Sequence, residues 1–513
     1  MKKWLPALLL SLIAVPAWAY GPIAVQADGT PIKHVGLSST HSLVWNPETG
    51  PLQDTSSKHT FVTQRVNATS DQVSAFQELL HFCGLTSAGG RTASSFGTPA
   101  DTGGSSSGGC SMNPFESIAY AATDNSTGTT LIHDAYAVWA AVSTADLSFS
   151  QGTSLGVDVN LCNYFNYIET DMFPLSDSTD PRVCAALGTC SGSSVNPVVF
   201  DGNGDIVAAE YGEANRSTLL GSAGPTVWSG QPGFIRMQAL LNGVCLSDAP
   251  DTAACGTGTI SLADMRSIMV HELGHSLGLS HSQVNLTSVT FDSNGYASLV
   301  DPSYTGDIVT MFPVLVQTSP TSTTNVDLSS LHTDDIAGIS HLYPKSTYAA
   351  GVCTASGTVY YGGAGQRCVE VVLRDTTSGA GKTNALSFIT GAEKKNRSLV
   401  DTDGTTYTLC DESTTERCGD YSITGLQPGK TYTIEVNSIY PSFTGGSRVD
   451  PCAHIPTFSA YPVYPAGVNS GVPHNTMVAA HGTIACPAPG GSTITCTGAG
   501  GTTANTGLCV TIP

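Results

Sequence analysis

Apolar residues recur with helical spacing in several segments of the chain, and shorter apolar runs lie between them. The helical spacing predicts helices at 71–82, 131–142, 261–278 and 334–343. Short apolar runs lie at 42–45, 147–149 and 198–200, and the last two are strand-like. Helices that alternate with strands predict a mixed α+β region, which we end near residue 346.

The pattern changes after residue 347 to short alternating runs separated by Gly, Pro and Asp. These runs lie at 358–360, 369–373, 421–423 and 432–436. Regularly spaced short strands predict an all-β sandwich over residues 347–483. Residues 484–513 are rich in Gly and Thr and contain three cysteines, so we expect a disulfide-stapled extension.

Composition divides the first half of the chain further. Residues 86–114 lack a hydrophobic period over most of their length and are rich in Ser and Gly, which is typical of a linker. We therefore expect a separate N-terminal region at 20–85 and a second region at 115–346.

Charge and the first residues bear on partners and location. The chain has 513 residues, with Lys+Arg 20 against Asp+Glu 40 and a net charge of −20. This charge repels phosphate, so we expect no nucleic-acid partner. Lys2 and Lys3, an apolar run at 8–15 and Ala17-Trp18-Ala19 predict a bacterial-type signal peptide at 1–19. No later apolar stretch is long enough to span a bilayer, so we expect no stable membrane insertion. We expect the exported protein to be a monomer.

Export makes the fifteen cysteines candidates for disulfides. The close pairs Cys184/Cys190 and Cys245/Cys255 can each close a local loop, although spacing does not fix the connectivity. The odd number leaves at least one cysteine unpaired in a monomer.

Asp201, Asn203 and Asp205 alternate with glycine directly after the predicted strand at 198–200. Alternating oxygen ligands are typical of Ca²⁺ loops, whereas Asn-Gly and Asp-Gly steps between apolar runs predict a hairpin. We favour the hairpin, because the other ligands of an EF-hand-type loop are missing.

Three histidines lie within the eleven residues 271–281, at and just beyond the end of the helix predicted at 261–278. His271 and His275 are one turn apart on one helix face, so both imidazoles can bind one Zn²⁺. Gly278 can reverse the chain and bring His281 round as the third ligand. Three protein ligands leave the fourth position for water, which is the arrangement of a catalytic zinc.

Glu272 directly follows the first of these histidines. A carboxylate beside a zinc-activated water can serve as general base and pass the proton to a leaving amine. The pattern therefore predicts a zinc endopeptidase that acts on proteins or peptides. The alternative is an adhesion or binding protein with a non-catalytic zinc. Such a structural zinc site normally has a fourth protein ligand.

The motif resembles that of the metzincin metallopeptidases, H-E-x-x-H-x-x-G-x-x-H followed by a Met-turn. Ser282, the segment Thr310-Met311-Phe312-Pro313 and the helix at 334–343 are similar to the matrixin branch. This resemblance implies that 115–346 is a catalytic region and 20–85 its pro-region. It also implies a zincin fold with a twisted mixed sheet and an active-site helix. It also implies that Met311 forms an apolar floor under the zinc, and that 313–330 walls the primed-side specificity pocket.

Two further implications of the resemblance concern single residues. The paired Asp334 and Asp335 are similar in place to those that anchor the Met-turn and the mature N-terminus. Matrixin zymogens are silenced by a propeptide cysteine, and Cys83 has the corresponding place, although it lacks the flanking Arg and Asp. We favour the alternative that Cys83 pairs with Cys110. Because 196–214 contains no histidine, we expect no structural zinc.

The C-terminal part resembles carboxypeptidase-regulatory-like or prealbumin-like β-sandwiches. The resemblance rests on Gly357-Thr358-Val359, Gly419-Asp420-Tyr421 and the segment from Gly425 to Tyr432. Such modules are usually non-catalytic, so we expect an accessory domain whose removal leaves hydrolysis of short peptides intact.

Overall fold

A computed structural model describes most of the residues after position 124 and a shorter part of the chain before it. The described residues are 22–23, 31–53, 111–113, 116–117, 125–160, 163–168, 195–228, 233–247, 255, 258–292, 297–361, 364–365, 369–377, 379, 381–390, 419–438, 477–486, 493–495 and 509–512. The helix predicted at 71–82, the cleavage signal, the linker residues 86–110 and the Cys184/Cys190 pair lie outside these ranges.

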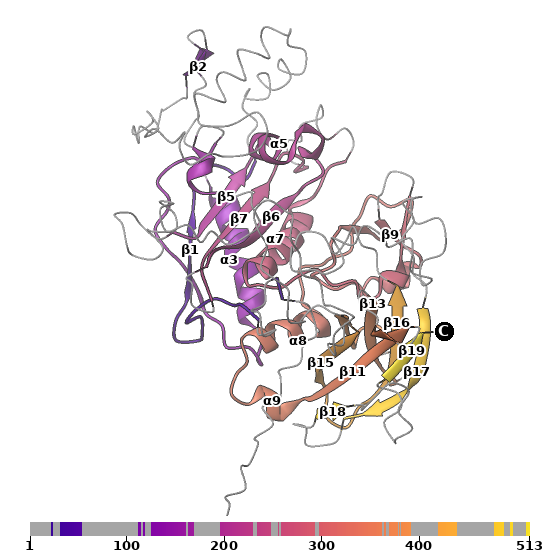
Figure 1. Ribbon diagram of the computed structural model, residues 1–513. Helices are drawn as coiled ribbons and strands as arrows, with labels where there is room; N and C mark the ends of the chain where they lie inside the picture. The colour runs from indigo at the N-terminus through magenta and orange to yellow at the C-terminus, as the bar shows by residue number, and fades with distance from the viewer. Residues whose placement is uncertain are drawn as a thin grey trace, which may run out of the picture.

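A five-stranded sheet organises the first half of the molecule (Figure 1). Its order is β4 (Phe149–Gln151), β1 (Leu43–Pro47), β5 (Pro197–Asp201), β7 (Phe234–Asn242) and β6 (Gly221–Trp228). The first four strands are parallel, and the edge strand β6 runs antiparallel to β7. Helices α3 (Ser126–Ala140) and α7 (Leu262–Ser276) pack against each other, and α7 also packs against β6 and β7.

The helices predicted around 131–142, 261–278 and 334–343 are all present, with shifted ends. Ser261 caps α7 through a capping box with Asp264, as its sequence position predicted. Helix α8 (Thr333–Leu342) begins one residue earlier than expected, with His332 at the N-cap position. The other short elements of this half are α5 (Asp205–Tyr211), η2 (Tyr164–Asn166), η3 (Glu213–Asn215), η4 (Leu286–Ser288), η5 (Pro302–Tyr304), β2 (Ser111–Asn113), β3 (Glu116–Ser117), β8 (Val289–Phe291), β9 (Ala297–Leu299) and β10 (Val316–Gln317).

Strand β1 corrects the expected boundary at residue 85. It pairs in parallel with β4 on one side and with β5 on the other, so it lies inside the sheet. Trp45 is 1% exposed and stacks on Tyr136 of α3 at a ring-centroid distance of 5.8 Å. Residues 31–53 therefore belong to the same folded unit as the region at 115–346, and do not form a unit of their own.

Polar contacts also fix the residues that directly follow β1. The fully buried carboxylate of Glu48 accepts hydrogen bonds from the amides of Val159 and Phe200. Gln53 Nε2 donates to Leu246 O over 2.8 Å. Burial, reinforced by the neighbouring Asp158, raises the pKa of Glu48 well above its ordinary value. These contacts tie the segment to strand β5 and to two loops of the region.

Two further sheets occupy the C-terminal half. One has the order β12 (Ala364–Gly365), β11 (Cys353–Tyr361), β15 (Asp420–Leu426), with β18 (Thr493–Thr495) and β19 (Cys509–Ile512) also paired to β11. The other has the order β14 (Ala385–Ile389), β13 (Val369–Asp375), β16 (Thr431–Ser438), β17 (Met477–Ala485), and the short helix α9 (Tyr348–Gly351) precedes them. A disulfide between Cys353 and Cys486 joins β11 to the residue after β17. Residues after 484 thus complete these sheets as strands, where a separate extension was expected.

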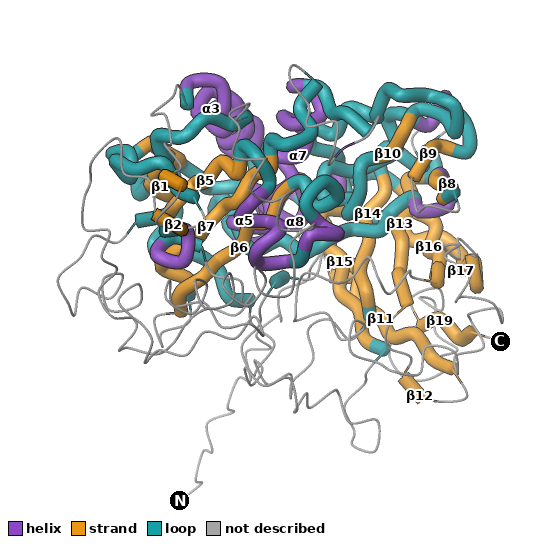
Figure 2. Tube along the Cα trace, turned by 90° about the horizontal axis from the view of Figure 1, so that it is seen from above, coloured by secondary structure: helices purple, strands orange, loops and turns teal. Residues whose placement is uncertain are grey.

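The C-terminal sheets pack directly on the catalytic region, and α8 lies between the two halves (Figures 1 and 2). Helix α8 contacts β14 and β15. Val372 and Ala385 belong to the same buried cluster as Phe312, Val316 and other residues of segment 284–328. The two halves share buried apolar surface, so the C-terminal half is more closely integrated than the expected accessory domain.

No helix among these described residues is long and apolar enough to cross a membrane.

A cut in the segment between β1 and α3 should leave β1 in place, since its pairing and the burial of Trp45 do not depend on that segment. We expect a specific protease site inserted between residues 95 and 96 to yield two fragments that co-elute in native gel filtration. They should separate only in denaturant. The same cut in Cys83→Ser controls for a disulfide across the nick. A free N-terminal fragment from that variant would show that 31–53 is a removable pro-region after all.

Candidate metal centre

The three motif histidines converge at the end of α7. His271 and His275 lie on successive turns of the helix, and His281 follows five residues after the helix ends. One nitrogen from each ring lies within 4.8 Å of the other two, and His275 Nε2 is 3.0 Å from His281 Nε2. Nitrogens about 2.0–2.1 Å from a tetrahedral Zn²⁺ are roughly 3.3 Å apart, so this donor set fits zinc.

Main-chain carbonyls orient two of the rings. Thr310 O lies 2.8 Å from His271 Nδ1, and Leu279 O lies 2.7 Å from His275 Nδ1. A carbonyl accepts only, so each Nδ1 carries the proton and each Nε2 has its lone pair available for a metal. Burial lowers the pKa of both histidines, which favours the neutral form that binds metal.

A sharp reversal after α7 brings His281 to the other two ligands. Gly278 has φ 98°, a left-handed conformation that glycine adopts without strain. Three consecutive carbonyls at this helix end receive hydrogen bonds from distant segments. His34 Nε2 donates to Ser276 O over 2.7 Å, Tyr343 OH to Leu277 O over 2.9 Å, and the Ile23 amide to Gly278 O over 2.9 Å.

Glu272 lies beside the histidine cluster and is 8% exposed. The amide of Ala223 in β6 hydrogen-bonds to this carboxylate, while Oε2 is buried and has no partner. Burial raises the pKa of Glu272 to about 8. A cation bound by the three histidines would lower this pKa again. An unpartnered carboxylate oxygen at this place can accept a hydrogen bond from a water molecule.

Gly221 makes room for this carboxylate at the start of β6. A β-carbon built on Gly221 would lie 2.7 Å from Glu272 Cγ and 2.9 Å from Oε1. Any side chain at this position would therefore push Glu272 away from its place, so the strand requires glycine here.

Met311 packs against Gly274 of α7, which directly precedes the ligand candidate His275. It is fully buried, and a β-carbon on Gly274 would lie 2.3 Å from its sulfur. Asp335 holds the turn through its two carboxylate oxygens, which accept from the amides of Thr310 and Met311 over 3.1 Å each. The Thr310 carbonyl that orients His271 is thus fixed by the neighbouring helix α8.

Asp334, the other member of the pair, has different partners. It accepts hydrogen bonds from Ser282 Oγ over 2.6 Å, from the Ser387 amide over 2.8 Å and from Ser387 Oγ over 3.0 Å. Ser387 lies in β14 of the C-terminal half. A strand thus satisfies the carboxylate for which the resemblance implied an N-terminal ammonium group.

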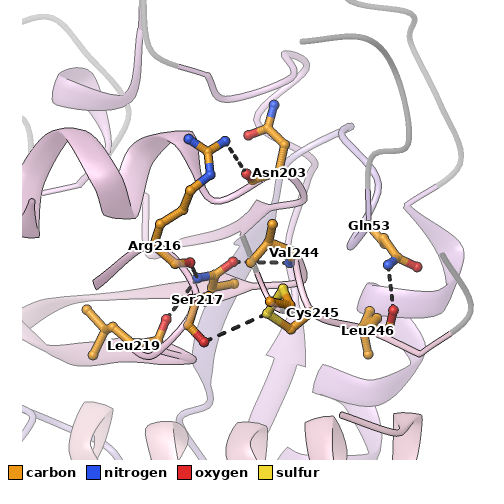
Figure 3. Close-up of a disulfide and its surroundings, with 10 residues drawn as sticks. Gln53, Asn203, Arg216, Ser217, Leu219, Val244, Cys245 and Leu246 are labelled. Carbon is orange, nitrogen blue, oxygen red and sulfur yellow. Dashed lines mark hydrogen bonds between the residues drawn. A yellow bond between two sulfur atoms is a disulfide. The ribbon is translucent and has the colours of Figure 1, made fainter. Parts of the chain in front are cut away.

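The 201–205 loop is not a hairpin, and its carboxylates bind other groups of the chain. Strand β5 leads through a turn into helix α5, so the predicted second strand at 206–208 is helical. Asp201 Oδ2 accepts from the Val207 amide over 2.8 Å and caps this helix. The buried guanidinium of Arg216 binds Asp205 Oδ1 over 2.5 Å. It also donates to Asn203 O over 2.7 Å (Figure 3). Arg216 thus supplies a positive charge at the place where the less favoured calcium alternative put a cation.

The cysteine predictions have separate outcomes. Cys245 and Cys255 form a disulfide, which confirms the predicted local loop before α7 (Figure 3). Cys83 and Cys110 lie outside the described residues, so both the latency switch and their pairing stay predictions.

Sequence reasoning missed the residues that surround the ligands. Gly221 and Gly274 are essential through the space they leave, and His34 and Ser387 act from segments far away in the chain. For Gly274 a signal existed, because a glycine inside a helix is costly and needs a packing reason. The other three give no sign in the linear sequence.

Gly274→Ala should destabilise the protein, although alanine favours helices by ~1 kcal/mol. The new methyl group would overlap Met311, and overpacking typically costs about 1–3 kcal/mol. We expect the free energy of unfolding in urea, measured without metal, to fall, and the added loss from Gly274→Ala to shrink in a Met311→Ala background. A more stable Gly274→Ala protein would contradict the contact.

Comparison with known proteins matches one segment of the chain. A family model described as matrixin matches residues 117–293, about a third of the chain, including the three histidines and Glu272. Neither curated proteins nor solved structures give a match. The match supports a metzincin-type catalytic domain with a catalytic zinc in this segment, and hence a metallopeptidase.

Proposed function

We propose that the protein is an exported zinc endopeptidase of the matrixin-like type. His271, His275 and His281 hold the metal, and Glu272 is the general base. The observation that carries this proposal is the buried Glu272 Oε2, which has no hydrogen-bond partner and lies next to three convergent imidazoles.

A binding protein with a structural zinc is the less favoured reading. Structural zinc sites are closed by four protein ligands, whereas the metal-type cluster in the described part of the chain contains three. A structural zinc site also has no role for the carboxyl group of Glu272, whose buried Oε2 has no hydrogen-bond partner.

The chemistry divides between the metal and the chain. Bound zinc lowers the pKa of a coordinated water to about 7 and polarises a carbonyl group. Glu272 takes the proton of the attacking water and returns it to the leaving amine. The Ala223 amide fixes this carboxylate from the side of β6. Thr310 O and Leu279 O keep the rings of His271 and His275 in the ligating tautomer.

The edge strand β6 is the surface on which we expect the substrate to lie. Its outer side has no strand neighbour among the described residues, and its first residue touches the general base. An extended peptide can pair with such an edge and place a scissile bond beside Glu272. Segment 313–330 is expected to wall the primed side, with Met311 as the floor under the metal.

The proposed C-terminal β-sandwich consists of the two sheets that contain β11 and β13. Both contribute buried residues to one core, for example Val359 and Val371.

A latency role for Cys83 has to leave β1 in the enzyme, since β1 lies within the catalytic sheet. Under this proposal activation frees the metal without removing residues 31–53.

Glu272→Gln should keep zinc and lose turnover, because the three ligands are unchanged and the base is gone. General-base catalysis typically contributes 10²–10⁴-fold, so we expect kcat to fall by about that factor. Metal content by mass spectrometry and hydrolysis of casein, with and without chelator, measure the two effects. His271→Ala and His281→Ala should lose metal and activity together. Chelator-resistant cleavage, or full activity in Glu272→Gln, would refute the proposed roles.

Gly221→Ala should lower kcat, since its β-carbon would displace the Glu272 carboxylate. Gly351→Ala in α9 is the control, because its β-carbon would meet no atom within 4 Å and it lies outside the proposed substrate strand. We expect a fall of at least about ten-fold for the first variant and little change for the second, with equal zinc content. Equal kcat values for the two variants would show that β6 does not constrain the base.

A further inference from the structure

The third ligand, His281, lies on a loop and not on the zinc helix. Helix α7 ends at Ser276, so its geometry fixes His271 and His275 but not His281. The position of His281 depends on what holds the residues that follow it. Two of these, Ser282 and Asn285, are polar and each is 2% exposed.

Ser282 is held through Asp334. Its hydroxyl donates to Asp334 Oδ2, and the same carboxylate receives both the amide and the hydroxyl of Ser387. Asp334 is fully buried, so its orientation is set by these partners. The serine next to the third ligand is therefore bound, through one carboxylate, to strand β14.

Asn285 has a backbone conformation that needs support. Its φ of 66° is the only positive value of a non-glycine residue in the described ranges. The Nδ2 group donates to Asp307 O over 2.7 Å and to Lys382 O over 2.9 Å, and Arg374 donates to Oδ1. Two of its three partners lie in or between β13 and β14.

Further contacts join the same two parts. Lys382 Nζ lies 2.9 Å from Ser288 Oγ and 3.3 Å from Asp307 Oδ2, and 3.1 Å above the centre of the Tyr304 ring. Val372 and Ala385 add apolar contacts to the cluster that contains Phe312, the residue after Met311. The hairpin β13–β14 thus contacts the chain after His281 and the chain around the Met-turn.

We propose that the hairpin β13–β14 positions the third zinc ligand, so that the catalytic unit of this chain includes the C-terminal sheets. Ser387 acts through Asp334 and Ser282, and Arg374 and Lys382 act through Asn285. The inference rests on the proposed zinc endopeptidase function, and none of these residues touches substrate or metal.

The test measures zinc affinity in the full chain by competition with a chelating dye, and kcat and KM for a peptide at saturating zinc. Ser387→Ala removes one hydrogen bond to Asp334, whereas Ser387→Thr retains the hydroxyl. Asn285→Gly keeps the left-handed conformation available and removes all three side-chain bonds. Ser356→Ala is the matched control, since Ser356 Oγ bonds Ser422 Oγ over 2.6 Å within the C-terminal sheets.

Residues that support metal ligands typically change affinity by 10–100-fold when altered. We expect zinc binding to weaken about ten-fold or more in Asn285→Gly and less in Ser387→Ala, with kcat largely restored by excess zinc. Ser387→Thr and Ser356→Ala should match the wild type. If Asn285→Gly does not fold, the difference in zinc affinity between Ser387→Ala and Ser387→Thr tests the inference.

Wild-type zinc affinity in both Asn285→Gly and Ser387→Ala would overturn the inference and leave the proposed function intact. An equal loss in Ser356→Ala would also overturn it, since the effect would then be general destabilisation. A wild-type chain that binds no zinc would instead refute the proposed function, which makes the two failures distinguishable.

Discussion

The reversal of the chain after α7 is the constraint on which the metal centre depends. A helix can present two ligands on one face, but the third must return from beyond the helix end, and that exposes carbonyls that no helical amide can satisfy. Here His34, Tyr343 and the Ile23 amide bind three successive carbonyls of this turn. Burial lowers the pKa of His34 to about 4, so it stays a neutral donor at physiological pH.

Several buried polar groups near this reversal are paired across long sequence distances. Asp335 fixes the Met-turn, Asp334 joins Ser282 to Ser387, and Asn285 joins two halves of the molecule. Each such group is expensive to bury alone and specific when paired, so these pairs select one arrangement of the apolar core. Glu272 is the exception at the centre, where an unpartnered oxygen is available for chemistry.

Local signals in the sequence predicted the parts of the fold that local physics determines. The capping box at Ser261, the ligand spacing on α7 and the disulfide of Cys245 all depend on residues close in sequence. Predictions failed where a distant residue decides the outcome. The Asp-Gly steps at 201–205 indicated a hairpin, but Arg216 pairs with Asp205 and the chain turns into a helix. Similarly, β1 looked like a separate segment because its partners β4 and β5 begin about 100 and 150 residues later.

The buried contacts around the metal centre extend over more of the chain than the segment that matches the matrixin family model. The matrixin match covers 117–293, yet the sheet that positions α7 requires β1 at Leu43–Pro47, and the segment after His281 requires β14 at Ala385–Ile389. Removing β1 would expose two strand edges and the buried Trp45. Removing β14 would leave the carboxylate of Asp334 without two of its three donors. The smallest unit consistent with these contacts therefore extends well beyond both ends of the recognisable segment, because the ligands are local and their supports are not.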